Sequence, residues 1–579
     1  MAIIFKIFPF LLRIRDYKKE NLIRDFFAGI TISLVLIPQS ISYAMIAGLP
    51  PIYGLYAAAI PPIIAAMWGK ASFLATGPVA MVSLLTFSSI VPFAKPGTPE
   101  FINMAINLAL LVGIIQLLMG ALRLGFIMRF ISHPVIVGFT NAAAIIIAST
   151  QIQHMFGISV KSSEFVLPMF IDIARNIGDT NFYTLAVGLF AFGIIIVGRR
   201  IHEKFPGAMV ASVITTVLAY LVNLNEFGVK TIGDMPTGLP SPSFFIIDFE
   251  YAARLIGPAL VIAIVGFMEA LAITKAISSK TKEAVDVNQE LIGQGAANLI
   301  GSLFKSYPVS GSFSRSAVNL QAGGRTALSN VFSGLIVIVA LLFFTSSFYY
   351  LPKATLAAII MYAVIGLIKH SQFIKLYKTS RHDGIIALMT FLFCFITKPD
   401  YAIFIGIGIS LLFFLWESMA PRITILTRNP KTEIFGDAEA FDLPTCPQIL
   451  YLRPEFSIYF ANAEFIRETI LEKAAEKKNG LKFVLIDMES VNKIDATGVD
   501  EMKELIMEIR KLGLELYIAN AHKPVRDVLL NSGILSLLEQ KRCLQSKAES
   551  ITLLFNKIDY KYCKDKCPHT IFWECETVK

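Results

Sequence analysis

The feature that most constrains this chain is a long series of apolar runs between about Asp25 and Trp416. Many of these runs are roughly 17–25 residues long, which is the length that a helix needs to cross a hydrocarbon core of about 30 Å. From about Pro421 onward the density of charged residues rises to that of an ordinary soluble domain. The sequence therefore predicts an α-helical polytopic membrane domain followed by a small soluble domain.

Composition and charge support this division. Of the 579 residues 55% are hydrophobic and only 16% are charged, whereas soluble proteins carry roughly 25% charged residues. The net charge of +9 does not indicate nucleic-acid binding, because the basic residues cluster before the first span and in alternate loops, such as Arg199–Arg200. The opposite loops carry acids, such as Glu226 and Asp234. Cytoplasmic loops are rich in Lys and Arg, so we expect both termini in the cytoplasm. Met1–Phe10 lacks the features of a cleavable signal peptide.

We expect fourteen spans that divide into two sets of seven, at 27–46, 53–68, 73–91, 101–122, 133–153, 182–198, 207–224, 255–277, 285–303, 310–321, 326–343, 352–369, 381–397 and 399–417. The third opens with Ser72–Ala80 (SFLATGPVA), and the tenth follows Tyr307–Ser312 (YPVSGS). Both are interrupted by Pro and Gly, at matching places in the two sets. Paired interruptions of this kind indicate the binding site of a transporter.

A helix that begins inside the membrane leaves backbone N–H groups unpaired, and its dipole adds about half a positive charge at that end. Two such ends facing each other would form a cradle for an oxyanion. One edge is predicted at Thr76, Gly77, Pro78, Val79 and Ala80, and the other at Ser310, Gly311, Ser312, Phe313 and Ser314. The alternative is a pair of Pro/Gly kinks in ordinary spans, which membrane helices tolerate.

Two charged residues in apolar surroundings are candidates for the chemistry of this site. Arg315 would supply a fixed positive field for an anion, or else it reaches the interface or pins helices together. Glu269, near the centre of its span, is the one clear carboxylate that the sequence places inside the apolar domain. Burial favours its protonated form, so a proton and an anion would enter together. The alternative for Glu269 is a structural pair with Arg315 or Lys275.

Gln39 and Tyr43 in the first span are four residues apart and share a helix face, so both could point at the ligand. A hydrogen bond between helices explains Gln39 equally well. His133 and His154 flank the fifth span and are predicted as interface residues.

The soluble part alternates predicted strands and helices, which is typical of a small α/β domain. The strands are expected at Gln448–Arg453, Phe483–Asp487 and Glu515–Ala519. Cysteines in a reducing compartment argue against disulfides. Tail residues Cys563, Cys567, His569 and Cys575 form a cluster that could bind zinc, but their spacing matches no strong metal motif. Plain cytosolic thiols are the favoured interpretation, so no metal and no cofactor are predicted.

Four motifs in this order resemble the SulP anion-transporter family: Ile37–Ala44 (IPQSISYA), Ala75–Val82 (ATGPVAMV), Asn288–Gly295 (NQELIGQG) and Val309–Asn319 (VSGSFSRSAVN). Phe483–Val499 (FVLIDMESVNKIDATGV) resembles a STAS domain. The resemblance implies two inverted repeats of seven segments, a core domain that moves against a gate domain, and a homodimer. It also places the anion site at Gln39 and Tyr43, Thr76–Ala80, Glu269 and Ser310–Arg315.

By this resemblance the chain is predicted to import sulfate with protons across the cell inner membrane by alternating access, and not to be an enzyme. The glutamate at 269 favours protons, because sodium-coupled bicarbonate members carry an aspartate in this neighbourhood. A sodium-coupled bicarbonate carrier and an anion-occupied sensor that does not transport are the alternatives.

Thr497 is a candidate phosphorylation site or the cap of the next helix. The STAS domain could bind a protein partner. The expected boundaries are 1–24 for the N-terminal segment, 25–420 for the transport domain, 421–437 for a linker, 438–560 for the STAS domain and 561–579 for a tail.

Overall fold

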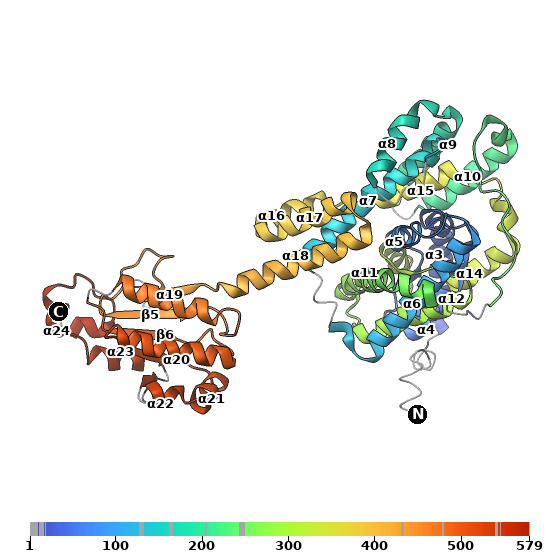
Figure 1. Cartoon of the computed structure of the whole chain (residues 1–579). Helices are drawn as coiled ribbons and strands as arrows, with labels where there is room; N and C mark the ends of the chain where they lie inside the picture. The colour runs from blue at the N-terminus through green and yellow to red at the C-terminus, as the bar shows by residue number, and fades with distance from the viewer. Residues whose placement is uncertain are drawn as a thin grey trace. The chain divides into compact units, whose positions relative to one another are not determined.

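The computed structural model describes residues 10, 17, 19–126, 132–160, 166–202, 205–242, 249–429, 434–477, 480–538, 542–544 and 546–577. The chain divides into two compact units, Met1–Ser410 and Leu411–Lys579, a helical unit and an α/β unit (Figure 1). Residues 1–9, 11–16 and 18 of the predicted N-terminal segment, 430–433 of the predicted linker and 578–579 of the predicted tail lie outside the described residues.

Each of the fourteen predicted spans corresponds to a helix, or to a short strand followed by a helix. In chain order these are α3 (Lys19–Ile46), α4 (Ile52–Trp68), β1 (Ala75–Gly77) with α5 (Ala80–Ile90), α6 (Pro99–Ala121), α7 (His133–Phe156), α9 (Phe182–Ile201), α10 (Gly207–Val222), α11 (Phe249–Thr281), α12 (Val287–Leu303), β2 (Ser310–Ser312) with α13 (Phe313–Gln321), α14 (Leu328–Phe343), α15 (Lys353–Ile365), α17 (Arg381–Ile396) and α18 (Pro399–Met419). Two further amphipathic helices, α8 (Val166–Asn176) and α16 (His370–Thr379), were not predicted.

Among the described helices, seven are long and apolar enough to cross a membrane. Large apolar side chains stand exposed on several of them, including Leu189 and Phe190 on α9 and Leu412 and Trp416 on α18. Exposed apolar surface of this kind is what a lipid-facing helix presents.

The contacts between helices repeat when the two sets of seven are exchanged. Helix α12 packs against α6, and its counterpart α4 packs against α14. Helix α11 packs against α6 in the same way that α3 packs against α14, and α17 packs against α7 as α9 packs against α15. The predicted fold of two repeats of seven is confirmed by this internal symmetry.

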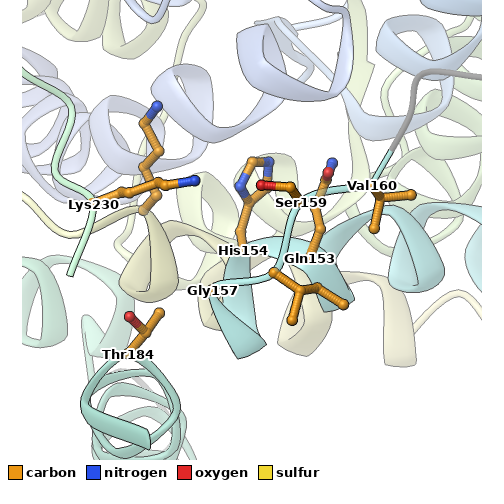
Figure 2. Close-up of a pocket in the computed structure, with 9 residues that line it drawn as sticks. Gln153, His154, Gly157, Ser159, Val160, Thr184 and Lys230 are labelled. Atoms are coloured by element: carbon orange, nitrogen blue, oxygen red, sulfur yellow. The ribbon is translucent and has the colours of Figure 1, made fainter. Parts of the chain in front are cut away.

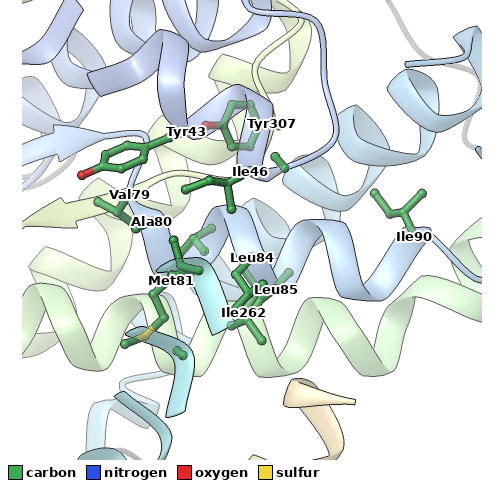
Figure 3. Packing of buried hydrophobic residues seen from close by; sticks show 14 of the residues in the cluster. Tyr43, Ile46, Val79, Ala80, Met81, Leu84, Leu85, Ile90, Ile262 and Tyr307 are labelled. Atoms are coloured by element: carbon green, nitrogen blue, oxygen red, sulfur yellow. The ribbon is translucent and has the colours of Figure 1, made fainter. Parts of the chain in front are cut away.

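The two predicted interruptions meet each other as an antiparallel pair. Strands β1 and β2 align Ala75 with Ser312, Thr76 with Gly311 and Gly77 with Ser310. Pro78 lacks an N–H donor and ends the first strand. Helix α5 then packs into the apolar core, with Leu84 and Leu85 close to Ile262 of α11 (Figure 3). The pairing therefore brings together two segments that lie more than two hundred residues apart in the sequence.

Buried polar side chains of α12 hold this strand pair in place. Asn298 accepts a hydrogen bond from the Val309 backbone N–H at 2.8 Å and donates to the Val309 carbonyl at 3.1 Å. The Glu290 carboxylate accepts from the backbone N–H groups of Lys70 and Ala71 at 2.9 and 3.0 Å. These bonds satisfy backbone groups that an irregular segment would otherwise leave unpaired inside the bundle.

The α/β unit contains a six-stranded sheet in the order β4-β3-β5-β6-β7-β8. Its strands are β3 (Ile423–Arg428), β4 (Phe435–Asp437), β5 (Ile449–Pro454), β6 (Phe483–Asp487), β7 (Glu515–Ala519) and β8 (Cys543–Leu544). Strands β5 to β8 are parallel, and β3 and β4 are antiparallel to their neighbours. The helices are α19 (Ala463–Glu476), α20 (Ala496–Lys511), α21 (Lys523–Asn531), α22 (Ile534–Leu538), α23 (Lys547–Phe555) and α24 (Tyr560–Asp565), followed by a 3-10 turn at Trp573–Thr577.

Two predicted boundaries need correction in this unit. Residues 421–437, predicted as a linker, contain strands β3 and β4, because Ile423 and Leu426 are buried against the sheet. The tail is also packed, since Cys563, Ile571 and Phe572 belong to the apolar cluster on one side of the sheet.

Candidate functional site

The helical unit encloses a cavity of about 410 Å³ beside the β1–β2 pair. Residues from both repeats line it: Val35, Gln39, Tyr43, Val79, Ala80, Met81, Ile195, Arg199, Pro206, Gly207, Ala208, Glu269, Ser312, Phe313, Ser314, Ile359, Tyr362, Ala363, Val364, Ile365, Gly366 and Leu367. The cavity is large enough for a small inorganic ion together with several water molecules, each of which occupies about 30 Å³ in the liquid.

Most of the predicted site residues line this cavity, and the others lie in or behind the β1–β2 pair that forms its wall. Those that line the cavity are Gln39, Tyr43, Val79, Ala80, Glu269, Ser312, Phe313 and Ser314. Those that do not are Thr76, Gly77, Ser310, Gly311 and Arg315. Within the first group, Val79, Ala80, Ser312, Phe313 and Ser314 lie where the two half-helices begin, whereas Gln39 and Tyr43 lie on α3 and Glu269 lies on α11.

Both half-helices begin at the cavity wall. Helix α5 starts at Ala80, and its N-cap Val79 offers no side-chain acceptor to the first backbone N–H groups. Helix α13 starts at Phe313, and the Ser312 hydroxyl accepts only weakly from the Arg315 backbone N–H, at 3.5 Å. Free N–H groups and a positive dipole end occur at each of these termini. The wall therefore presents two electropositive backbone ends to the cavity.

The predicted residues that do not line the cavity hold the β1–β2 pair, which forms the cavity wall, in position. The Thr76 hydroxyl accepts from the Gln294 side-chain amide at 2.8 Å, and the Ser310 hydroxyl donates to the Gly266 carbonyl at 2.6 Å. A Cβ atom on Gly311 would lie 2.6 Å from Leu74 Cδ1 and 3.1 Å from Ala270 Cβ, so a larger residue would require these neighbours to shift. None of these three residues lines the cavity, and their contacts support the strand pair, while their role as ligands stays a prediction.

Arg315 is the largest fully buried side chain of the described residues, with 0% of its surface exposed. No described group forms a hydrogen bond with its Nε, Nη1 or Nη2 atoms. Its guanidinium lies behind Gly77, where an added Cβ would be 3.3 Å from Nη2. It interacts electrostatically with Tyr43 and Glu269. A buried charge without a bonded partner costs several kcal/mol, and no described residue forms a hydrogen bond or ion pair with this cation, although Glu269 interacts with it through space.

Glu269 lies on α11 at the cavity, and its Oε2 atom is buried without a hydrogen-bond partner among the described residues. The predicted alternative, a direct pair with Arg315, is not formed, because the guanidinium nitrogens have no described partner either. Lys275, the other proposed partner, is exposed. The carboxyl group is therefore free to respond to whatever enters the cavity.

One sequence inference about Glu269 is wrong. It is not the only buried carboxylate of the apolar domain, since Asp25 and Glu290 are 0% and 2% exposed. Their environments differ from that of Glu269, because both carboxylates accept hydrogen bonds from backbone N–H groups. Sequence position does not reveal this difference.

Gln39 and Tyr43 are 7% and 5% exposed, and both line the cavity from α3. The Gln39 Oε1 atom is buried and has no hydrogen-bond partner in the described part of the chain. The alternative of an interhelical bond to this oxygen is thus not realised, and the amide stands available to a ligand.

Arg199 and the loop at Pro206–Gly207 line the cavity but were missed as site residues. Arg199 was interpreted as part of a cytoplasmic basic group. Small residues such as Ala363 and Gly366 also line the cavity. The sequence does not single them out, since small residues are common throughout membrane helices.

In the α/β unit, Thr497 is exposed near the start of α20. The helix is capped by Asp495, whose Oδ1 accepts from the Gly498 backbone N–H at 2.8 Å. The alternative of Thr497 as the cap is therefore wrong, while its phosphorylation stays a prediction. Among the described residues no group of three or more His, Cys, Asp or Glu side chains is arranged to hold a metal ion.

Substitution of Ser314 by phenylalanine is expected to fill part of the cavity. Ser314 lines the cavity and is itself exposed to it, so the larger side chain fits without unfolding the helix but occupies the ligand's volume. We expect at least a tenfold loss of anion affinity, or about 1.4 kcal/mol, measured by equilibrium binding. Ser371→Phe, on the exposed side of α16, is the matched control. Unchanged affinity in Ser314→Phe would remove this residue from the site.

Comparisons with known proteins agree with the architecture. The model of the sulfate permease family matches residues 22–390, and that of the STAS domain matches residues 440–547. The chain is 35% identical over 551 residues to the chloroplastic sulfate transporter 4.1 of Arabidopsis thaliana, covering 92% of this chain and 80% of the relative. It is 31% identical over 568 residues to sulfate transporter 1.3 of the same plant, covering 94% and 87%.

Two solved structures share the fold. The murine anion transporter named Solute Carrier 26 family member A9, in an inward-facing state, matches with a TM-score of 0.87 at 23% identity, over 95% of this chain and 94% of that one. The transmembrane domain of a cyanobacterial bicarbonate transporter, BicA, matches with a TM-score of 0.59 at 23% identity, over 68% of this chain and 98% of that one.

Proposed function

The chain belongs to the sulfate permease family, and on this premise we propose that it imports sulfate together with protons by alternating access. The family consists of anion transporters rather than enzymes. Two of its relatives are named sulfate transporters and align with more than nine tenths of this chain. The proposal concerns how the cavity of this chain would select a divalent anion and couple it to a proton.

The observation that carries the proposal is the unpartnered guanidinium of Arg315 behind two helix ends. Each helix end contributes about half a positive charge, so the two ends and Arg315 together amount to about +2. Sulfate carries two negative charges and would balance this field. Bicarbonate would neutralise only part of it. Buried charges are stable when a counterion and hydrogen bonds compensate them, and sulfate offers four oxygens to the free N–H groups.

Glu269 supplies the coupling in this proposal. Its unpartnered Oε2 lies at the same cavity. Ionised, the carboxylate would cancel part of the positive field and repel the anion, whereas protonation removes that repulsion. The anion and the proton would therefore stabilise each other's binding, as linkage requires. Movement of the gate helices around the loaded site would carry both across the membrane.

The proposal also includes the orientation of the chain in the membrane and the conformational state of the cavity. The basic loops favour an inner-membrane orientation with both termini in the cytoplasm. In that orientation Arg199, Gly207 and Gly366 lie on the cytoplasmic side of the cavity, which would make the present state inward-facing. A homodimer, a protein partner of the STAS domain and phosphorylation of Thr497 stay predictions.

The test is uptake of labelled sulfate into proteoliposomes with and without an inward proton gradient. Wild-type uptake should be saturable, should rise with the gradient and should be competed by unlabelled sulfate. Glu269→Gln mimics the protonated carboxyl, so it should lose at least about tenfold of gradient-driven accumulation while it keeps sulfate binding and sulfate–sulfate exchange. Glu226→Gln, on an exposed turn, is the control. Full proton-driven uptake in Glu269→Gln would remove the coupling role.

The same vesicles distinguish the other functions. Bicarbonate uptake under an inward sodium gradient, without sulfate uptake, would identify the bicarbonate carrier. Charge movement without flux of any anion would identify a sensor. Either result would overturn sulfate import.

A further inference from the structure

A second pocket, of about 200 Å³, lies at the opposite end of the helices that line the central cavity. Its lining comes from the end of α7 and the residues after it, from α9, from the segment after α10 and from the start of α15: Gln153, His154, Gly157, Ile158, Ser159, Val160, Thr184, Lys230 and Lys353. Figure 2 shows His154, Thr184 and Lys230 placed around it. Nothing in the proposed transport site uses this pocket.

The pocket gathers positive charge and contains no acid among its lining residues. Lys230 and Lys353 both interact electrostatically with His154. No described residue forms a side-chain hydrogen bond or ion pair with either ammonium group. Lys230 also interacts electrostatically with Lys353, and like charges repel each other, by about 1 kcal/mol at 4 Å in water and by more where the dielectric constant is lower. An arrangement that gathers them favours binding of an anion.

The backbone holds the two lysines together. The Lys353 N–H donates to the Lys230 carbonyl at 2.9 Å, and the Ile232 N–H donates to the Leu351 carbonyl at 3.0 Å. A β-bridge joins Thr231 to Pro352 between these bonds. Lys353 is also the first residue of α15, where the helix dipole adds positive potential. The charge cluster is therefore built by the fold rather than by the chance meeting of mobile side chains.

Buried apolar residues of α9 and α15 lie between this pocket and the central cavity. On α15, Lys353 lines the pocket and Ile359 lines the cavity, about 9 Å apart along the helix axis at 1.5 Å per residue. On α9 the corresponding residues are Thr184 and Ile195, about 16 Å apart. The fully buried residues Ala191, Leu356 and Ala358 fill the space between them.

We propose that this pocket is a loading subsite for a small oxyanion, which occupies it before the apolar layer opens toward the central cavity. The inference rests on the proposed function, because in the proposed orientation this end of α15 faces away from the cytoplasm. The chemistry that it recognises is a compact oxyanion. The source is free inorganic sulfate, and the phosphate of an anionic lipid headgroup is the competing source that the test separates.

The test measures sulfate binding and uptake in the double variant Lys230→Gln/Lys353→Gln. Loss of two charges should raise the KM for sulfate about tenfold with little change in the maximal rate, because the central site is intact. Lys230→Arg/Lys353→Arg, which keeps the charge, should restore the wild-type KM. Lys95→Gln removes one exposed charge from the same predicted face and should leave KM unchanged. An unchanged KM in the double variant would overturn the proposal.

A second measurement separates this proposal from the function itself. In Arg315→Met the central site should no longer bind sulfate, so calorimetry should detect a weaker residual site. That residual binding should disappear when Lys230→Gln and Lys353→Gln are added, even if no transport is detected. Residual binding that survives the lysine substitutions would overturn the subsite whatever the uptake shows.

A third experiment tests whether a lipid phosphate occupies the pocket. It compares sulfate binding in membranes of phosphatidylcholine alone with sulfate binding in membranes that also contain phosphatidylglycerol. A lysine-dependent sulfate site in both membranes supports free sulfate as the ligand. A lysine-dependent retention of phosphatidylglycerol, without any lysine effect on sulfate, would overturn the loading role and assign the pocket to a lipid headgroup.

Discussion

Replacement of Arg315 by methionine is expected to abolish saturable sulfate uptake while the ligand-free protein stays at least as stable as the wild type. The guanidinium is fully buried and has no described hydrogen-bond partner, so its removal relieves an uncompensated desolvation cost. The same change deletes the charge that would bind the anion. We expect a loss of at least about 100-fold in kcat/KM, which corresponds to about 2.8 kcal/mol.

Two measurements on purified Arg315→Met check this expectation. Thermal unfolding without sulfate should show a midpoint equal to or above that of the wild type, and added sulfate should raise this midpoint clearly less than it raises that of the wild type. Arg200→Met, which removes an exposed arginine near the end of α9, should behave as the wild type in both measurements. A large loss of stability in the ligand-free protein would instead show that Arg315 is a structural ion that pins helices together.

Replacement of Glu290 by alanine is expected to have the opposite signature, with a large loss of stability. The carboxylate accepts the backbone N–H groups of Lys70 and Ala71 and also a bond from the Gln294 side-chain amide at 3.1 Å. A buried donor that loses its acceptor costs about 1–3 kcal/mol. The Gln294 donor is buried and the two backbone donors are partly buried, so we expect the free energy of unfolding to fall by about 3–5 kcal/mol. Gln294 in turn holds Thr76 of β1, so the site geometry should loosen as well.

The control for this prediction is Glu290→Gln, which keeps one acceptor oxygen and should lose clearly less stability than the alanine variant. Thermal unfolding in detergent, followed by light scattering and intrinsic fluorescence, gives the comparison. If Glu290→Ala kept its stability and lost only the proton dependence of uptake, the coupling carboxylate would be Glu290 rather than Glu269.

These two residues illustrate why the role of a buried charge has to come from the structure. Glu269 and Glu290 are both carboxylates in apolar sequence, but only Glu269 was predicted from the sequence to be a coupling group. Glu290 is hydrogen-bonded to backbone amides, whereas Glu269 has an oxygen at the cavity without a hydrogen-bond partner among the described residues. Hydrogen bonding to a carboxylate stabilises its charged form, so the two side chains are suited to different tasks.

The sequence by itself determined the architecture. The length of the apolar runs predicts the spans, because a bilayer requires a fixed helix length. Gly77-Pro78 and Tyr307–Ser312 predict the two interruptions, since both contain a proline and a glycine, and proline breaks helical hydrogen bonding. The changed charge density after about Pro421 predicts the soluble domain. All of these are local properties of the chain, and each can be inferred within a window of about 20 residues.

Only the tertiary structure decided which residues reach a ligand. Thr76 and Val79 belong to one motif, yet one supports the wall and the other lines the cavity. Likewise, Lys230 and Lys353 share a pocket only because a β-bridge joins segments that are distant in sequence. The physical reason is that side-chain direction and long-range pairing depend on the packing of the whole bundle, which no local pattern specifies.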